Sequence, residues 1–333
     1  RRGTGPISTR VATDLGEEQR AGVCQDRGMS DNGYGRTRRA GSRGSYGGRS
    51  GDRRGGRARR VYDDEPRDGS LSDLVGHLHA LDDRSYAAYK AIVGRYEAPD
   101  GWVLHVDRVQ PDPYAPPTRI RLEIPADLPG LEILADRGLV GTVDRRLAVR
   151  DFLTRELHAG FKGTALSIAS PGQEILERSA VVLLPAANSP DGPDDSDGRA
   201  DADNPSSTSA ADWTIEVRAR MSLPAQGRSI QGHEAARIVG RDLTREIEEA
   251  LDLTGARAER LLAHVEALED HRALTTAVRE AGWVSFLADG SLLPRRSGVS
   301  DEPLRSGAVA LRAPDSLAAT VELPHAGAVR GTA

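Results

Sequence analysis

The chain has 333 residues, a hydrophobic content of 38% and a formal net charge of -5 at pH 7. These values allow one or two globular domains, and the net charge does not by itself indicate a polyanionic partner. The single cysteine, Cys24, excludes an intrachain disulfide and a cysteine-based zinc site. No apolar run approaches the roughly 18 residues of a membrane span, so we expect a cytoplasmic protein without a membrane partner.

Residues 1–69 are predicted to form a disordered arm rich in arginine and glycine. Composition changes sharply at Met29, so we interpret residues 1–28 as translated upstream sequence or a fragment of something longer, outside the native fold. Between Met29 and Arg60, ten arginines accompany two aspartates and almost no apolar side chains. Ordering such a segment would cost backbone entropy without compensating burial.

Residues 70–232 are predicted to form an amino-terminal α+β domain. Ser70 and Asp73 have the spacing of a capping box, which predicts a helix from residue 71. In 118–124, apolar and charged residues alternate as a half-buried strand requires. The expected helices of this domain are 71–81, 85–94 and 143–160, and the expected strands are 102–110, 118–124, 164–170, 178–185 and 213–224.

A long acidic loop, residues 186–212, separates the last two expected strands. It carries six aspartates between Asp191 and Asp203. Loops longer than about 12 to 15 residues inside a compact domain are usually functional or disordered. We predict a disordered insertion within a β-hairpin.

Residues 233–333 return to helix and then to strand. Helical spacing covers 233–253 and 255–282, and strands are expected over 283–288 and 317–324. The whole chain is therefore predicted to have an α+β fold with mixed sheets and helices, preceded by the arm.

Motifs for nucleotide and metal chemistry are incomplete. The segment "GFKGT" at Gly160–Thr164 lacks the G-x-x-x-x-G-K-[ST] spacing of a phosphate-binding loop. The histidines show no zinc-binding spacing, and no G-x-S-x-G elbow is present. These residues predict neither a catalytic group nor a metal ligand in this chain.

The arm carries the clearest charge signal. Arginines can pair with phosphates, tyrosines can stack on unpaired bases, and glycines keep the backbone pliable, so RNA or another single-stranded nucleic acid is the expected partner. A solubilising tail is the alternative. The candidate residues are Arg36, Arg38, Arg39, Arg43, Arg49, Arg53, Arg54, Arg57, Arg59, Arg60, Tyr34 and Tyr46.

Several stretches, in this order, resemble the predicted ATPases of the ABC class. They include "SIASPGQEILERSAVVL", "IEVRARMSLPAQGRSIQGHEAARIV", "GWVSFLADGSLLPRRSGV" and "VELPHAGAVRGTA". The resemblance covers most of 71–333. It implies an amino-terminal α+β domain followed by an ABC-type domain that acts on ATP with Mg²⁺. It also implies that the protein forms a homodimer. In the family, the last stretch leads into the phosphate-binding loop, which is not among these residues, so the chain alone is not expected to hydrolyse ATP.

The loop "ADGSLLPRRSG" follows an expected strand, and its Asp289–Gly290 pair is a turn signal. We expect Arg295, Arg296 and Ser297 at the end of a sheet. Ion pairs with Asp301 and Glu302 would explain the two arginines without a ligand. The resemblance instead favours contact with nucleotide phosphate or with the domain interface that closes over it.

A non-enzymatic RNA-binding protein that uses its arm is the competing interpretation of the whole chain.

Overall fold

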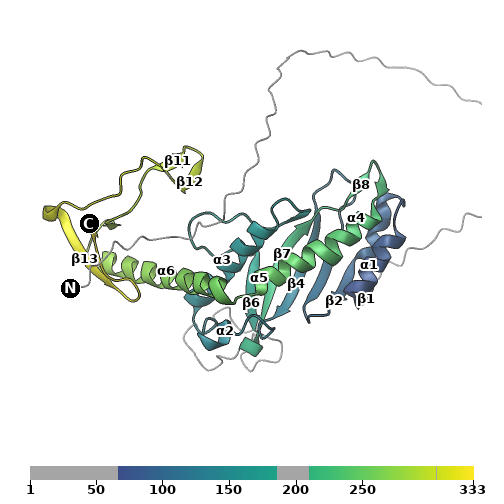
Figure 1. Cartoon of the computed structure of the whole chain (residues 1–333), viewed down its shortest axis with the longest axis horizontal. Helices are drawn as coiled ribbons and strands as arrows, with labels where there is room; N and C mark the ends of the chain where they lie inside the picture. Colours follow the sequence, from purple (N-terminus) through teal and green to yellow (C-terminus); the bar gives the residue numbers. More distant parts are fainter. Residues whose placement is uncertain (1–66, 186–209, 305) are drawn as a thin grey trace, which may run out of the picture. The chain divides into compact units, whose positions relative to one another are not determined.

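The computed structural model describes residues 67–185, 210–304 and 306–333 (Figure 1). The predicted disordered arm, up to residue 66, and most of the acidic loop lie outside the described residues. Residues 67–69, which we assigned to the arm, belong instead to strand β1 (Arg67–Ser70). The sequence "RDGS" has no strand-like alternation, and the segment becomes a strand because it pairs with β2 (Gly94–Glu97).

A mixed sheet of seven strands forms the centre of the fold. Its strand order is β1-β2-β3-β4-β7, and both β5 and β6 pair with β7. Only β1 and β2 pair in parallel within this sheet. The remaining strands are β3 (Val103–Arg108), β4 (Thr118–Pro125), β5 (Leu166–Ser167), β6 (Val181–Pro185) and β7 (Trp213–Met221). The antiparallel pairing of β6 with β7 confirms the hairpin expected around the acidic loop.

Helices cover one face of this sheet (Figure 1). They are α1 (Leu71–Ala80), α3 (Val143–Gly160), α4 (Gly232–Arg237) and α5 (Thr244–Leu251), while the short α2 (Ile133–Asp136) lies at one end of the sheet. A π-helical turn, Ile238–Leu243, joins α4 to α5 within the single helix that we expected. The helix expected over 85–94 is a 3-10 helix, Tyr86–Ile92, and the chain continues from it into β2.

The core lies between the helices and the buried face of the sheet. Alternate residues of β4, including Ile120, Leu122 and Ile124, are almost fully buried, while Arg119, which precedes Ile120, is exposed. Residues 233–251, which lie beyond the predicted domain division at 232/233, contribute buried side chains such as Val239 and Ile247 to this same core. The period-two pattern therefore gives the sheet one apolar face and one charged face.

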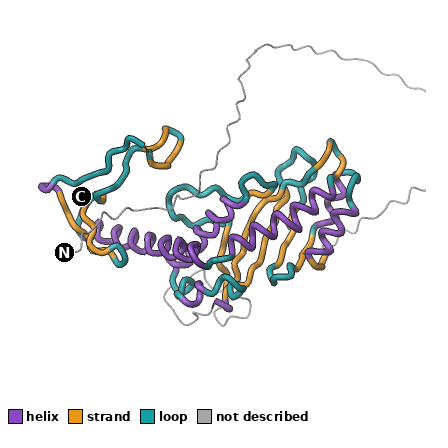
Figure 2. Tube along the Cα trace, in the orientation of Figure 1, coloured by secondary structure: helices purple, strands orange, loops and turns teal. Residues whose placement is uncertain are grey.

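Helix α6 (Gly255–Glu280) packs on α3 and leads to the carboxy-terminal strands (Figure 2). There, β10 (Leu287–Ala288), β13 (Ala318–Leu323) and β14 (Gly327–Thr332) form a three-stranded sheet. Strand β14 was not predicted, and the strand expected over 283–288 is reduced to its last two residues. Gly331 lets β10 approach closely, because a Cβ there would meet the Leu287 carbonyl oxygen and the Phe286 ring.

Two small ribbons and two short 3-10 turns complete the described elements. The ribbons are β8 (Ala225–Gln226) with β9 (Ser229–Ile230), and β11 (Arg295–Ser297) with β12 (Ser300–Pro303). The turns are Ala210–Asp212 and Asp315–Leu317.

The α+β fold with a mixed sheet is confirmed. Among the described helices, none combines the length and apolar character needed to cross a bilayer.

Candidate functional site

The three predicted nucleotide contacts lie on the β11–β12 ribbon. Arg295, Arg296 and Ser297 are all exposed. This ribbon is separate from the three-stranded sheet, so the expectation that the arginines sit at the end of that sheet is wrong. The Arg296 guanidinium Nη1 lies 2.6 Å from Glu302 Oε2. The ion pair that we considered as the alternative is thus present for Arg296.

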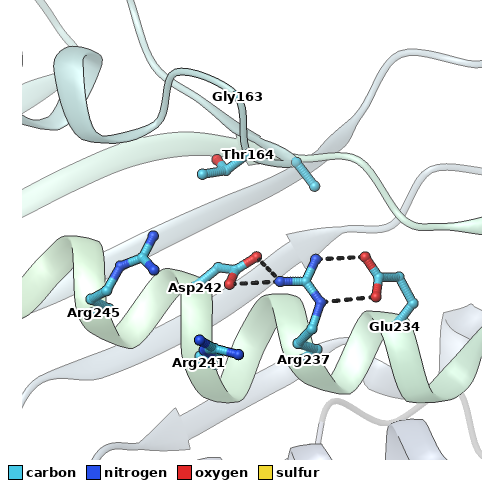
Figure 3. A pocket seen from close by; sticks show the side chains of 8 residues that line it. Gly163, Thr164, Glu234, Arg237, Arg241, Asp242 and Arg245 are labelled. Atoms are coloured by element: carbon cyan, nitrogen blue, oxygen red, sulfur yellow. Dashed lines mark hydrogen bonds and ion pairs between the residues drawn. The ribbon is translucent and has the colours of Figure 1, made fainter. Parts of the chain in front are cut away.

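A polar groove lies between the turn after α3 and the helix that runs from α4 to α5 (Figure 3). Its volume is about 540 Å³. Arg237, Arg241 and Arg245 are four residues apart and face the groove together, as helical spacing requires. We call it the arginine groove; it is lined by Gly163, Thr164, Ala165, Glu234, Arg237, Arg241, Asp242 and Arg245.

Carboxylates neutralise most of the charge in the arginine groove. Arg237 donates two hydrogen bonds to Glu234, at 2.6 and 2.9 Å, and two to the buried Asp242, at 2.7 and 2.8 Å (Figure 3). The hydrogen bonds to Glu234 make the largest contribution to raising the pKa of Arg237, and the same bonds lower the pKa of Glu234. Arg237 is therefore held as a permanent cation between two anions.

The other two arginines differ in their partners. Arg245 donates hydrogen bonds to the buried Glu246. Arg241 is exposed, and its side chain makes no hydrogen bond or ion pair within the described parts of the chain. The groove can offer one uncompensated guanidinium to a small anion, which is less than a phosphate cradle requires.

The "GFKGT" segment forms part of the groove wall and does not have the geometry of a phosphate-binding loop. Such a loop precedes a helix, so that free backbone N–H groups and the positive end of the helix dipole point at the phosphate. Here Gly160 ends α3 and the segment follows it, at the negative end of the dipole. Lys162 and Thr164 are thus not placed for nucleotide binding.

A row of ion pairs joins α3 to α6, and we call this contact the α3–α6 seam. At its centre is Asp151, whose side chain is fully buried. Arg155 Nε donates to Asp151 at 2.6 Å, His264 Nε2 lies 3.1 Å from it, and Arg178 also donates to it. The other ion pairs are Arg145–Glu269, Asp144–Arg272, Glu156–Arg257 and Glu156–Arg260.

Hydrogen bonding controls the protonation of Asp151. Burial acts to raise the pKa of this carboxyl, but the hydrogen bonds from His264 and Arg155 outweigh burial and lower its pKa. The carboxylate is charged at neutral pH. It ties α6 to α3 and, through Arg178, to the "PGQEILER" segment.

Helix α6 also contacts the carboxy-terminal hairpin, which consists of β13 and β14. Glu269 accepts from Arg145 of α3 at 2.7 Å and lies 2.6 Å from His325 Nε2, in the β13–β14 turn. Asp270 accepts from the backbone N–H groups of His325 and Ala326, both at 2.9 Å. Helix α6 thus connects α3 with the hairpin through the adjacent carboxylates of Glu269 and Asp270.

A complete phosphate-binding motif is missing from the sequence, and a metal-binding cluster is missing from the described residues. The sequence contains no G-x-x-x-x-G-K-[ST] motif. Across 67–185, 210–304 and 306–333, no group of three or more His, Cys, Asp or Glu side chains could hold a metal ion. His79 and His233 approach each other, with their Nδ1 atoms 2.7 Å apart, but they remain a pair.

The nucleic-acid candidates in the arm lie outside the described residues, so the structure places none of them.

Asp151 and His264 were not identified as functional residues from the sequence. A signal for Asp151 did exist, because it lies four residues after Leu147 on the apolar face of the predicted helix. A charged residue at a buried helical position needs a partner, although the sequence alone does not say which.

Comparison with known protein families matches two adjoining segments of this chain. Residues 71–254 match the amino-terminal domain of ATPases of the ABC class, and residues 257–333 match the P-loop domain. No curated protein matches this chain. Helix α3 belongs to the first matched segment and almost all of α6 to the second, so the α3–α6 seam joins the two. The resemblance noted from the sequence is confirmed: this chain belongs to the family of ATPases of the ABC class.

Proposed function

We propose that this chain acts in the binding and hydrolysis of ATP with Mg²⁺, with its amino-terminal domain coupled to the P-loop domain through the α3–α6 seam. One observation carries the proposal: two adjoining segments match the two domains of this ATPase family, and buried ionic contacts join them. Movement of α6 would be transmitted directly to α3, because separating the helices would leave the buried Asp151 without His264.

The 333-residue chain by itself is expected to lack ATPase activity. Phosphoryl transfer needs a phosphate cradle and a held metal ion, and the sequence contains no complete motif for either. The measurement is phosphate release with and without Mg²⁺. Magnesium-dependent turnover that a single substitution within this chain abolishes would contradict the expectation.

Arg295, Arg296 and Ser297 are proposed to contact nucleotide phosphate or the interface that closes over it. Their exposure on a narrow ribbon within the P-loop match supports this role. Phosphate would compete with Glu302 for Arg296, whereas the Arg295 side chain makes no ion pair within the described residues. Guanidinium groups bind phosphate oxygens in a fixed fork, which suits a clamp.

The test uses a protein in which this chain is joined to a G-x-x-x-x-G-K-[ST] segment. Arg295→Ala or Arg296→Ala should lower ATP affinity or turnover at least tenfold, equivalent to about 1.4 kcal/mol, without lowering the melting temperature. Arg312→Ala is the matched control, because Arg312 is also exposed within the same match. Equal losses in all three variants, or parallel losses of stability and activity, would count against a clamp.

We also propose a nucleic-acid partner, bound by the arm between Met29 and Arg60. Its support is the composition of ten arginines interleaved with glycine and two tyrosines. Deleting the arm should weaken RNA binding and flatten its salt dependence, at about 0.7 log units per lost phosphate contact. Unchanged affinity and slope would leave the arm as a solubilising tail.

A further inference from the structure

Three arginines lie side by side on the charged face of the seven-stranded sheet. Arg108 of β3 is directly opposite Arg119 of β4, and Arg119 is directly opposite Arg220 of β7. We call these three residues the arginine row. Neighbouring strands are about 4.8 Å apart, so the row spans roughly 10 Å across the sheet. Ser167 of β5 continues it on the far side of Arg220.

The arginine row is electrostatically unfavourable in the isolated protein. Like charges directly opposite each other on adjacent strands destabilise a sheet. All three side chains are exposed, and none makes an ion pair or a hydrogen bond within the parts of the chain that are described. Among the described residues, no carboxylate balances this positive charge.

The next row along the same strands shows the usual arrangement. Arg121 has Asp107, Glu123 and Glu216 as partners, and Arg218 donates to Glu216 at 2.7 Å. On β2, Arg95 pairs with Glu97 and Asp68. These other arginines on the charged face are therefore paired with carboxylates, whereas those of the arginine row are not, within the part of the chain that the structure describes.

An aromatic side chain is presented at the same end of the sheet. The loop that joins Arg108 to Arg119 contains Tyr114, whose side chain is 95% exposed. Asp112 Oδ1 accepts from the Tyr114 backbone N–H at 2.9 Å, which fixes the local turn. Prolines limit the backbone of the loop further; they are Pro111, Pro113, Pro116 and Pro117. The stiff loop thus presents an exposed aromatic ring whose face is available for stacking on a ligand.

We infer that the arginine row and Tyr114 form a binding surface for single-stranded nucleic acid on the folded domain. The arginines bind successive phosphates, and the tyrosine ring stacks on an unpaired base. An acidic peptide would satisfy the arginines but supply no base to stack on Tyr114. The inference rests on the proposed nucleic-acid partner, yet it uses none of the residues of the arm.

The experiment measures binding of a fluorescent oligouridine of about 15 nucleotides to the full chain by anisotropy, over a range of salt concentrations. The double variant Arg119→Ala/Arg220→Ala should bind at least tenfold more weakly, with a salt slope smaller by about 1.4, for two lost phosphate contacts. Its melting temperature should not fall, because the substitutions remove like-charge repulsion. Tyr114→Ala should weaken binding about tenfold and leave the salt slope unchanged, since stacking releases no counterions.

The matched control is Arg121→Ala/Arg218→Ala. It changes the same two strands, on the same face, and alters the net charge equally, but it removes arginines that carboxylates already neutralise. Affinity within about twofold of the parent chain is expected. Equal weakening by both double variants would overturn the inference, because only bulk charge would then matter.

An arm variant, with the ten arginines between Met29 and Arg60 changed to serine, separates this surface from the arm. If only the arm variant loses binding, the surface on the sheet is refuted while the arm proposal stands. If only the Arg119/Arg220 variant loses binding, the reverse holds. Binding of polyaspartate as tight as that of oligouridine, insensitive to Tyr114→Ala, would show that the surface binds acidic peptides and overturn the inference.

Discussion

Asp151 shows how one buried residue can hold two helices in place. Its carboxylate is fully enclosed, and it accepts from Arg155 on its own helix and from Arg178, while His264 of α6 completes the cluster. A buried charge of this kind persists because its partners compensate for lost hydration. The side chain specifies which part of α6 faces α3.

Replacing this carboxylate should therefore be costly. Asp151→Asn removes the anion and leaves Arg155 and Arg178 facing each other, so we expect a loss of about 3 kcal/mol in the free energy of unfolding. Urea denaturation is the measurement. Asp144→Asn on the same helix is the control, because the Asp144 side chain is 41% exposed and its pair with Arg272 should contribute about 0.5 kcal/mol. Similar losses in both variants would contradict the central role of Asp151.

At the scale of elements, the crossing of α1 and α4 depends on the absence of a side chain. Gly232 begins α4, and a Cβ there would lie 2.7 Å from the Asp82 backbone nitrogen and also meet the Leu78 carbonyl oxygen. The Gly232 N–H donates to Asp82 Oδ1 at 2.6 Å. Any larger residue must push the helix away from backbone atoms, which cannot rotate aside.

Gly232→Ala should accordingly destabilise the protein by about 2 kcal/mol, the usual range for overpacking a core contact. Gly76→Ala provides the opposite case, because no atom lies within 4 Å of a Cβ at that position of α1. There alanine should stabilise the helix by about 1 kcal/mol. Thermal unfolding of the two variants should show melting temperatures on opposite sides of the parent value.

At the scale of the whole molecule, α6 joins the two family-matched segments through carboxylates whose pKa values are lowered. Burial acts to raise the pKa of Glu269, but hydrogen bonds from Arg145 and His325 outweigh it, and the same balance holds at Asp151. Both groups bind protons more weakly in the folded state than in the unfolded chain. Protonation therefore favours unfolding.

A fall in pH should lower the stability that these two carboxylates provide. Stability from these two carboxylates is fully present above their ordinary pKa values of 3.8 and 4.5, and it is lost as the pH falls from there through the folded-state values. We expect the urea midpoint to decrease steeply below about pH 4.5. Asp151→Asn/Glu269→Gln should flatten this decrease. An equally steep decrease in the double variant would assign acid sensitivity to other carboxyls.

The sequence by itself determined the elements whose signal is local. The capping box at Ser70, the alternation over 118–124 and the apolar face of 143–160 each predicted an element found in the structure. The order of the family stretches predicted the family. Helical and strand periodicities extend over neighbouring residues, so they can be detected without knowing what the element packs against.

Tertiary structure alone decided the contacts between residues distant in sequence. Asp151 meets His264 across 113 positions, and Arg119 lies opposite Arg220 only because β4 pairs with β7 in one register. No local pattern marks β1, which exists because β2 lies beside it. Strand order, register and charge partners depend on which segments meet when the chain closes its loops, and a one-residue shift in register would turn every side chain of a strand to the other face.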